Sequence, residues 1–264
     1  MNRMKRLLLA AALCLMAAST LSAQAIVGAW YVGDTSSGDS DVLVFFSNGY
    51  YMHMNDDDTG GLDGYERGTY TWSGVNGTSF TVMAIADING DNGLSHNDNT
   101  SATISITGDI FTATDFDGEG TGDSILTRVT GAKDIVGAWY EGDITANDST
   151  AVVVFMSNLT YFTASDEGTD GDGHPGIERG SYTWVSDTGE FTSSTAVDTD
   201  GSSGFSGAPF ITNITISGDI MYLTDSEETG TFNSVTAVPE PSTYAVIAGV
   251  FVLGIAALRR RKQS

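Results

Sequence analysis

The amino-acid sequence carries the same pattern twice in the same order, and this repeat limits the fold more than any other feature. The segment from Ile26 to Tyr31 recurs from Ile135 to Tyr140, 109 residues later. The segment from Glu66 to Trp72 recurs from Glu178 to Trp184 at an offset of 112 residues. Because the offset changes so little, the pattern indicates a duplication with small loop insertions, and each copy of about 105 residues is long enough to be a domain. We predict domains at 26–131 and 132–237, joined by a connection too short to keep them from touching.

Each copy has the pattern of an antiparallel β domain. Short runs rich in β-branched and aromatic residues are interrupted by Gly, Asn and Asp every 8 to 12 residues, which is typical of strands joined by turns. Asn48-Gly49 favours a tight hairpin, because both residue types tolerate a positive φ. The first copy predicts strands at 27–32, 41–47, 49–54, 65–73, 78–86, 101–107, 109–115 and 123–129, and the second copy predicts the same eight. The predicted fold is therefore all-β, with two tandem homologous antiparallel domains, each a barrel or sandwich of about eight strands.

The charge of the repeat region excludes some partners. Between residues 26 and 238 the only basic residues are Arg67, Arg128, Lys133 and Arg179, and the formal net charge is −29. Such a surface repels nucleic acid and anionic lipid, because binding either one requires basic groups that release counterions. The same charge suits divalent cations, a basic polymer or solubility in salt.

The N-terminal 25 residues predict a secretory signal peptide with its helix. Three basic residues precede an apolar stretch from Leu7 to Ala18, and Ala23-Gln24-Ala25 fits the small-residue cleavage pattern. Cys14 is the only cysteine and lies within this stretch, so the exported chain would contain no disulfide. We expect its stability to depend on its hydrophobic core, on bound metal, or on both.

The C-terminal segment, 238–264, predicts a membrane anchor. Val238, Pro239, Glu240 and Pro241 precede residues 242–258, which carry no charge, and the basic tail at 259–262 consists of Arg259, Arg260, Arg261 and Lys262. Seventeen residues of helix at about 1.5 Å per residue come close to the lower limit for a transmembrane span. The basic tail would remain on the cytoplasmic side, which places the repeats across the membrane.

This arrangement resembles the PEP-CTERM sorting signal of exported bacterial proteins, in which a Pro-Glu-Pro motif precedes one membrane helix and a basic tail. The resemblance implies an exosortase-type processing enzyme and the secretion translocon as partners. It also implies a link to the export of extracellular polysaccharide, with the mature protein at the cell surface or outside the cell.

A second resemblance concerns the start of each copy. Gly28-Ala29-Trp30, together with Arg128 in the last predicted strand, resembles the Gly-x-Trp and late-strand Arg pairing of lipocalin-like β-barrels, in which the cation covers the indole. Gly137-Ala138-Trp139 repeats the opening, but Asn233 occupies the position at which the second arginine is expected. The alternative is that Trp30 and Trp139 are core residues of an unrelated barrel or sandwich.

One loop has the spacing of a calcium site. In the loop that starts at Asp87, oxygen-bearing side chains fall at positions 1, 3, 5, 9 and 12, which are Asp87, Asn89, Asp91, Ser95 and Asp98. The loop resembles the calcium loops of dockerin-type repeats, although Asn92 replaces the usual glycine at position 6. In the second copy the loop starts with Asp198-Thr199-Asp200-Gly201-Ser202, but position 12 is Pro209, which cannot ligate through its side chain and weakens the same prediction there. The acidic segments 56–58 and 166–172 leave a choice between cation binding and plain solvation.

Signatures of catalysis are sparse. His53, His96 and His174 have no zinc-site spacing, and the sequence contains no Gly-x-Ser-x-Gly elbow or phosphate loop. Glu66 and Glu178 recur beside Arg67 and Arg179, a pattern that favours structural ion pairs with partners elsewhere. The sequence therefore predicts an exported, non-enzymatic surface or matrix protein. The alternative is a small-ligand-binding module, for which a pocket of roughly 300 Å³ or more would be required, whereas a core filled by Trp30, Phe45, Tyr70, Trp72 and Phe80 would exclude it.

Overall fold

The computed structural model describes residues 24–36, 39–57, 63–90, 93–95, 102–114, 123–131, 134–145, 150–166, 175–201, 204–207, 210–226 and 228–236. The predicted signal peptide before residue 24, the sorting motif at Val238–Pro241, the predicted membrane helix and the basic tail lie outside these ranges. Within them, no helix is long and apolar enough to cross a membrane. A short 3-10 helix, η1 (Gln24–Ile26), precedes the first strand.

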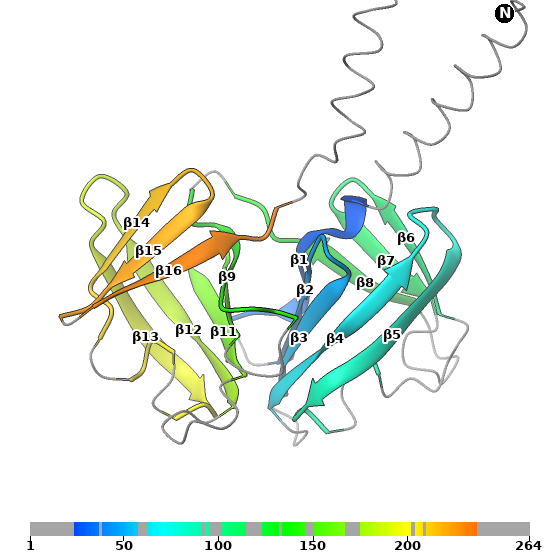
Figure 1. Cartoon of the computed structure of the whole chain (residues 1–264), viewed down its shortest axis with the longest axis horizontal. Coiled ribbons are helices and arrows are strands. Elements are labelled where there is room, and N and C mark those ends of the chain that lie inside the picture. The colour runs from blue at the N-terminus through cyan, green and yellow to red at the C-terminus, as the bar shows by residue number, and fades with distance from the viewer. Residues whose placement is uncertain are drawn as a thin grey trace, which may run out of the picture.

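The first copy folds into a closed barrel, called barrel 1 here, in which each strand pairs antiparallel with the next and β8 pairs with β1 (Figure 1). All eight predicted strands are confirmed. Their bounds are β1 (Gly28–Asp34), β2 (Asp39–Phe45), β3 (Tyr50–Asp57), β4 (Gly64–Trp72), β5 (Thr78–Asp87), β6 (Thr103–Thr107), β7 (Ile110–Thr114) and β8 (Asp123–Arg128).

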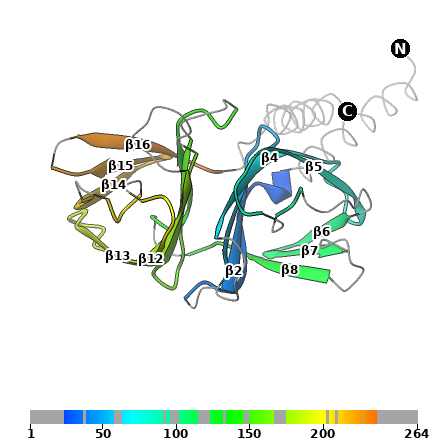
Figure 2. The same ribbon diagram turned by 90° about the horizontal axis from the view of Figure 1, so that it is seen from below.

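The second copy forms eight strands in the same sequence but does not close by regular pairing. This curled sheet, called sheet 2 here, has the order β13-β12-β11-β10-β9-β16-β15-β14 (Figure 2). Its edges meet at one bridge, Glu190 with Asn213, with hydrogen bonds of 2.7 Å from the Ile214 N–H to the Gly189 carbonyl and of 3.0 Å from the Phe191 N–H to the Thr212 carbonyl. The strands are β9 (Gly137–Glu141), β10 (Ala151–Phe155), β11 (Thr160–Ser165), β12 (Gly176–Trp184), β13 (Phe191–Asp198), β14 (Asn213–Ser217), β15 (Ile220–Thr224) and β16 (Thr229–Ser234).

Aromatic side chains fill the centre of each half. In barrel 1 the ring of Phe45 packs against Tyr70, Phe80 and Phe111, with centroids 5.0 to 6.0 Å apart. In sheet 2 Phe155 has the same place and packs against Tyr182, Phe191 and Phe205. Phe45, Tyr70 and Phe80 match Phe155, Tyr182 and Phe191, whereas Met221 occupies the position of Phe111 and the fourth ring of sheet 2, Phe205, comes from the loop after β13.

The repeated Glu-Arg-Gly motif has one structural role for each residue. A β-bulge falls between Arg67 and Gly68 and again between Arg179 and Gly180. A Cβ atom on Gly68 would lie 2.2 Å from the carbonyl oxygen of Met83, so a larger residue would separate β4 from β5. The glutamate before each arginine points into the barrel or sheet, whereas the arginine points out of it, because successive side chains of a strand face opposite sides.

The tight turn predicted at Asn48-Gly49 is present, but of the two residues only Gly49 has a positive φ, of +87°, so the expectation for Asn48 was wrong. Leu159 is the counterpart in the second copy and has a φ of +69°, the one positive φ of a non-glycine residue among the described residues. The second copy therefore has the same turn geometry with leucine at the position of the glycine.

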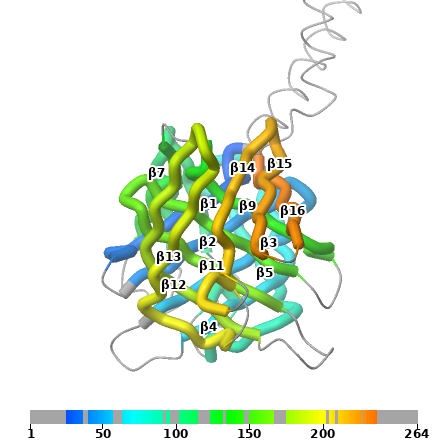
Figure 3. The backbone as a smooth tube through the Cα atoms, turned by 90° about the vertical axis from the view of Figure 1, so that its left-hand side faces the viewer, coloured from blue at the N-terminus to red at the C-terminus, as the bar shows by residue number. Residues whose placement is uncertain are grey.

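The two halves lie side by side (Figure 1), so that sheet 2 stands in front of barrel 1 in the view along the long axis (Figure 3). They join through an apolar interface, as expected from their short connection. The side chains on the outer faces of β2 and β3 belong to the same hydrophobic cluster as those on the outer faces of β10 and β11. Each of these residues is at most 1% exposed: Val42, Val44, Met52, Met54, Val152, Val154, Phe162 and Ala164. Because burying a side chain of this size stabilises by about 1.5–3 kcal/mol, the interface holds the halves together as a core does.

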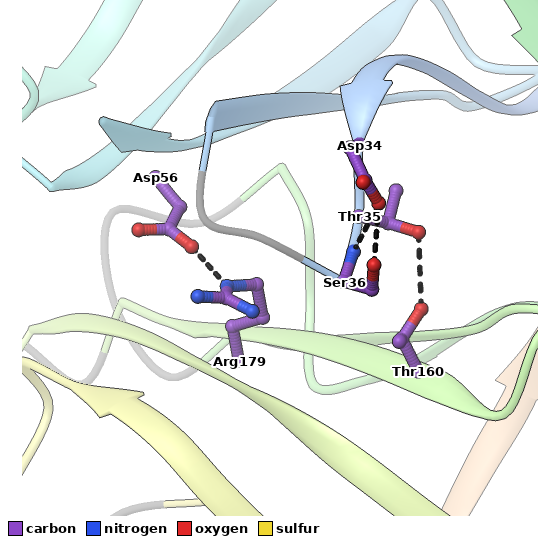
Figure 4. A network of polar contacts seen from close by, with 6 residues as sticks. All are labelled: Asp34, Thr35, Ser36, Asp56, Thr160 and Arg179. Carbon is purple, nitrogen blue, oxygen red and sulfur yellow. Dashed lines mark hydrogen bonds and ion pairs between the residues drawn. The ribbon is translucent and has the colours of Figure 1, made fainter. Parts of the chain in front are cut away.

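Two reciprocal ion pairs cross this interface. The Arg67 Nε lies 2.5 Å from the Asp166 Oδ2, with the two side chains 0% and 5% exposed. The equivalent pair on the other side of the interface is formed by Arg179 and Asp56 (Figure 4). Since Arg67 corresponds to Arg179 and Asp56 to Asp166, the halves are related as the subunits of a twofold-symmetric dimer are. Asp56 and Asp166, which the sequence left as acidic residues with a choice between solvation and cation binding, are buried partners of arginine.

Candidate functional site

The repeated glutamates lie inside the two halves, where each is surrounded by hydrogen-bond donors. Glu66 on β4 and Glu178 on β12 are both 0% exposed. The Tyr51 hydroxyl donates to Glu66, and the Tyr161 hydroxyl donates to Glu178. Burial and the adjacent glutamate raise the pKa of both tyrosines far above the ordinary value, so the phenols remain protonated donors.

The loops that follow β5 and β13 complete this arrangement. The Ser95 hydroxyl donates to the Glu66 Oε2 over 2.6 Å, and its N–H lies 3.0 Å from the same oxygen. In sheet 2 the N–H groups of Phe205 and Ser206 donate to the Glu178 Oε2 over 2.8 and 2.9 Å. A Cβ atom on either Gly93 or Gly204 would lie 2.4 Å from the glutamate oxygen, which explains why both loops have glycine there. Each loop therefore anchors itself on the buried glutamate.

The predicted calcium ligands are described only in part. Asp87 is exposed, whereas Asn89 is 0% exposed and its Nδ2 lies 3.5 Å from the His53 Nδ1. The Asn89 Oδ1 has no hydrogen-bond partner, and the Ser95 hydroxyl binds Glu66. Asp91 and Asp98 lie outside the described residues. Across the part of the chain that is described, no group of three or more His, Cys, Asp or Glu side chains is close enough together to hold a metal ion.

A polar network occupies one end of the interior of barrel 1. The Asp41 Oδ1 accepts a hydrogen bond of 2.8 Å from the Asn55 Nδ2 and lies 3.2 Å from the His53 Nε2. Burial raises the pKa of Asp41, but the hydrogen bond and charge of His53 and the hydrogen bond from Asn55 outweigh it, so the pKa lies below its ordinary value. With the Asn89 Nδ2 on the other nitrogen of His53, these side chains form one connected network inside the barrel, in which the Asn89 Oδ1 stays without a partner.

Sheet 2 has other residues at the positions that correspond to this network. His53 pairs with Leu43 in barrel 1, and Thr163 pairs with Val153 in the same register of sheet 2. Likewise, the Asp41 and Asn55 pair of barrel 1 is replaced in sheet 2 by Ala151 and Ser165. Smaller side chains therefore stand where the network fills barrel 1.

A pocket of about 340 Å³ lies at these positions in sheet 2, and we call it the sheet 2 pocket. Its lining includes Val153, Thr163, Ser165, Asp200, Phe205 and Phe232. Both carboxylate oxygens of Asp200 and the hydroxyls of Thr163 and Ser165 are buried without a hydrogen-bond partner. Buried polar groups are normally paired, so unpaired groups gathered on one pocket indicate a binding site.

A larger cavity of about 560 Å³ lies between the two halves, where β1 and β9 begin. It is lined by Gly28, Gly137 and their neighbours, and by Arg128. Arg128 donates to the Val27 carbonyl over 2.9 Å and covers the Trp30 ring. None of the buried unpaired polar side chains of the described residues lines this cavity, which makes the sheet 2 pocket the better candidate.

The guanidinium of Arg128 lies 3.9 Å from the centroid of Trp30, as expected from the Gly-x-Trp and Arg pattern. The expectation for the second copy was wrong in one detail. Ser234, rather than Asn233, pairs with Trp139 in the register where Arg128 pairs with Trp30. The prediction placed the missing arginine one residue too early, because the loops before the last strands differ in length.

The chain matches no protein-family model, and comparison with curated proteins finds no significant match. The assignment of a function therefore depends on the sequence motifs and on the geometry of the site.

Asp200 makes the stability of the protein depend on pH. Burial, the neighbouring Asp198 and the charge of Glu178 raise the pKa of Asp200 to about 8. Between about pH 4 and pH 8 the folded state therefore holds a proton that the unfolded chain has released, and stability falls as the pH rises. We expect Asp200→Asn to remove this contribution and to raise the Tm at pH 8 by about 2–4 °C for each kcal/mol gained.

Thermal melts of both proteins at pH 5 and pH 8 measure the effect, and the difference between wild type and variant is the quantity of interest. Asp109→Asn is the matched control, because the Asp109 side chain is 63% exposed. Wild-type and Asp200→Asn melting curves that shift in parallel with pH would contradict the assignment.

Proposed function

We propose that this chain is an exported, non-enzymatic protein of the cell surface or extracellular matrix, and that sheet 2 is a small-molecule-binding module within it. Export is supported by the N-terminal signal pattern and by the Pro-Glu-Pro motif, apolar segment and basic tail at the other end. A non-enzymatic role is supported by Glu66 and Glu178, whose buried carboxylates hold loops in place through several hydrogen bonds each.

The observation that carries the binding role is the sheet 2 pocket with its unpaired polar atoms. Its volume of about 340 Å³ lies in the range of small-molecule sites. The pattern of Gly28, Trp30 and Arg128 and the closed eight-stranded barrel support the resemblance to lipocalin-like proteins. Barrel 1 then serves as the scaffold, and sheet 2 as the half that has changed to take a ligand.

Deletion of Pro239–Pro241 tests the sorting part of the proposal. We expect the wild type to reach the cell surface or the medium after processing by an exosortase-type enzyme, and the deletion variant to remain in the cytoplasmic membrane. Envelope fractionation compares the two, and a reporter fused just before Val238 shows which side of the membrane the repeats reach. A reporter that faces the cell interior, or identical distributions of the two proteins, would contradict the proposal.

Calcium at the loop from Asp87 to Asp98 is proposed as a stabilising ligand of the exported form, supported by the spacing and by the unpaired Oδ1 of Asn89. Extracellular calcium loops bind with a Kd of about 10⁻⁴–10⁻³ M, so 5 mM calcium should stabilise by about 1–2 kcal/mol. Melting in calcium and in chelator, with Asp98→Ala as the variant expected to lose the response, measures this. An unchanged Tm would remove calcium from the proposal.

A further inference from the structure

The sheet 2 pocket contains a buried polar end. Asp200, Thr163 and Ser165 are 0%, 7% and 5% exposed. Among the described residues, the hydroxyls of Thr163 and Ser165 lack hydrogen-bond partners, and the Asp200 carboxyl has beside it only the acidic Asp198 and its own backbone to share a hydrogen bond with. Leaving a buried polar group unpaired destabilises the protein, and a charged group more than a neutral one. A ligand that offers several hydrogen-bond donors to one small region would remove this cost.

The acidic residues of the sheet 2 pocket favour a ligand with a positive charge. Its described lining contains four acidic residues and no Lys, Arg or His; the acidic residues are Glu141, Asp200, Asp225 and Glu228. Asp200 lies at the buried end, whereas Glu141 and Glu228 are exposed. Asp200 also faces the carboxylates of Glu178 on β12 and Asp198 on β13. A cation is therefore favoured over an anion at every depth of the pocket.

The rest of the wall is apolar. Phe205, Phe232 and Leu223 line it together with Val153. A calcium ion requires six to eight oxygen ligands, which these side chains do not provide. Aromatic and aliphatic walls suit the hydrocarbon part of an organic molecule, and an aromatic face also attracts an ammonium group.

We propose that the sheet 2 pocket binds a small organic ammonium ion, with the ammonium held by Asp200, Thr163 and Ser165 and the hydrocarbon part packed against Phe205 and Phe232. The inference rests on the proposed role of sheet 2 as a binding module and adds the chemical class of the ligand. The –NH₃⁺ group supplies three N–H donors, which matches one carboxylate and two hydroxyl acceptors.

Binding of an ammonium ion to the sheet 2 pocket is expected to release a proton. Asp200, whose raised pKa of about 8 keeps it largely protonated at neutral pH, would ionise when an ammonium ion lies beside it. Each binding event therefore releases close to one proton at pH 7. The measured binding enthalpy should change with the ionisation enthalpy of the buffer, in proportion to that release.

Isothermal titration calorimetry of the purified full chain with 2-phenylethylammonium tests the inference, in phosphate and in Tris at pH 7. The neutral 2-phenylethanol, the anionic 3-phenylpropionate and calcium chloride are the comparison ligands. We expect binding of the ammonium compound alone, with a buffer-dependent enthalpy. Asp200→Asn should weaken it at least about tenfold, since a charge-assisted hydrogen bond contributes about 1.5–3 kcal/mol.

Two further variants make the result specific. The triple variant Ala151→Asp, Thr163→His and Ser165→Asn transfers the barrel 1 network into sheet 2 and should abolish binding, whereas Asp109→Asn should leave it unchanged. If 2-phenylethanol or 3-phenylpropionate binds instead, and the triple variant abolishes that binding, the binding module stands and the ammonium assignment is overturned. Calcium binding that depends on Asp200 would also overturn it. If no probe binds, the ammonium inference and the binding role of sheet 2 both fail.

Discussion

Replacing Arg67 by methionine is expected to lower the free energy of unfolding by about 3–5 kcal/mol, since removing one member of a buried ion pair leaves the other charge buried without its counter-charge. The Asp166 carboxylate that Arg67 contacts is 5% exposed and lies at the interface between the halves. Arg67 also donates to the Ile144 carbonyl over 2.9 Å, so the substitution leaves a second polar group of sheet 2 without this bond. Urea unfolding followed by tryptophan fluorescence measures the loss.

The double variant Arg67→Met with Asp166→Leu should recover most of the stability, because an apolar pair can replace a buried ion pair at little cost. Arg179→Met should resemble Arg67→Met, since the twofold relation of the halves gives Arg179 the same role with Asp56. Asp109→Ala is the control, because Asp109 forms a more exposed ion pair with Arg128. It should change the free energy of unfolding by less than about 1 kcal/mol. A loss below about 1 kcal/mol for Arg67→Met would show that the interface does not depend on these pairs.

Much of the fold could be predicted from the sequence, because a duplication provides two independent samples of each strand. The strand positions follow from alternating apolar residues and from turn residues such as Asn48 and Gly49. Closure could not be predicted. Whether the edge strands β13 and β14 pair fully depends on loop lengths and on side chains from distant segments, and the sequence pattern is nearly the same in both copies.

The interface and the pocket escaped prediction for a physical reason. A strand with apolar side chains on both faces, such as β2, is expected to be buried on both faces. The pattern does not indicate which other strands pack against its outer face. One signal was nonetheless present. Of the four basic residues in the repeat region, Arg67 and Arg179 occupy equivalent positions, and so do the acidic residues Asp56 and Asp166. When two copies touch in a twofold arrangement, such equivalent opposite charges can form two reciprocal ion pairs across the interface.

The pocket could have been suspected from differences between the copies rather than from their similarity. Asp41, His53 and Asn55 of the first copy correspond to the smaller Ala151, Thr163 and Ser165 of the second. A substitution to a smaller side chain inside a barrel removes volume, and only the structure shows that the removed volume is continuous. The calcium spacing at 87–98 is a separate prediction about the first copy of this loop and gave no signal of the pocket in the second copy.

Replacing Trp30 by alanine is expected to cost about 3–5 kcal/mol, the usual loss for a large aromatic residue in a core. Trp30 is 0% exposed, its ring lies 5.4 Å from Phe111, and its indole N–H donates to the Ile26 carbonyl over 2.7 Å. The guanidinium of Arg128 covers the other side of the ring at 3.9 Å. The substitution therefore removes core volume, a hydrogen bond and a cation–π contact together, and equilibrium unfolding in urea measures the total.

A double-mutant cycle separates the cation–π contact from the rest. Combining Trp30→Phe with Arg128→Met should give a coupling energy of about 0.5–2 kcal/mol, because the indole ring is the strongest partner for a guanidinium. The matched cycle in sheet 2 combines Trp139→Phe with Ser234→Ala, where the register is the same but the cation is missing, and its coupling should stay below about 0.5 kcal/mol. Equal coupling in the two cycles would mean that Arg128 acts through its hydrogen bond to the Val27 carbonyl and not through the Trp30 ring. A large coupling in barrel 1 alone would show that the contact between Arg128 and the Trp30 ring itself stabilises barrel 1.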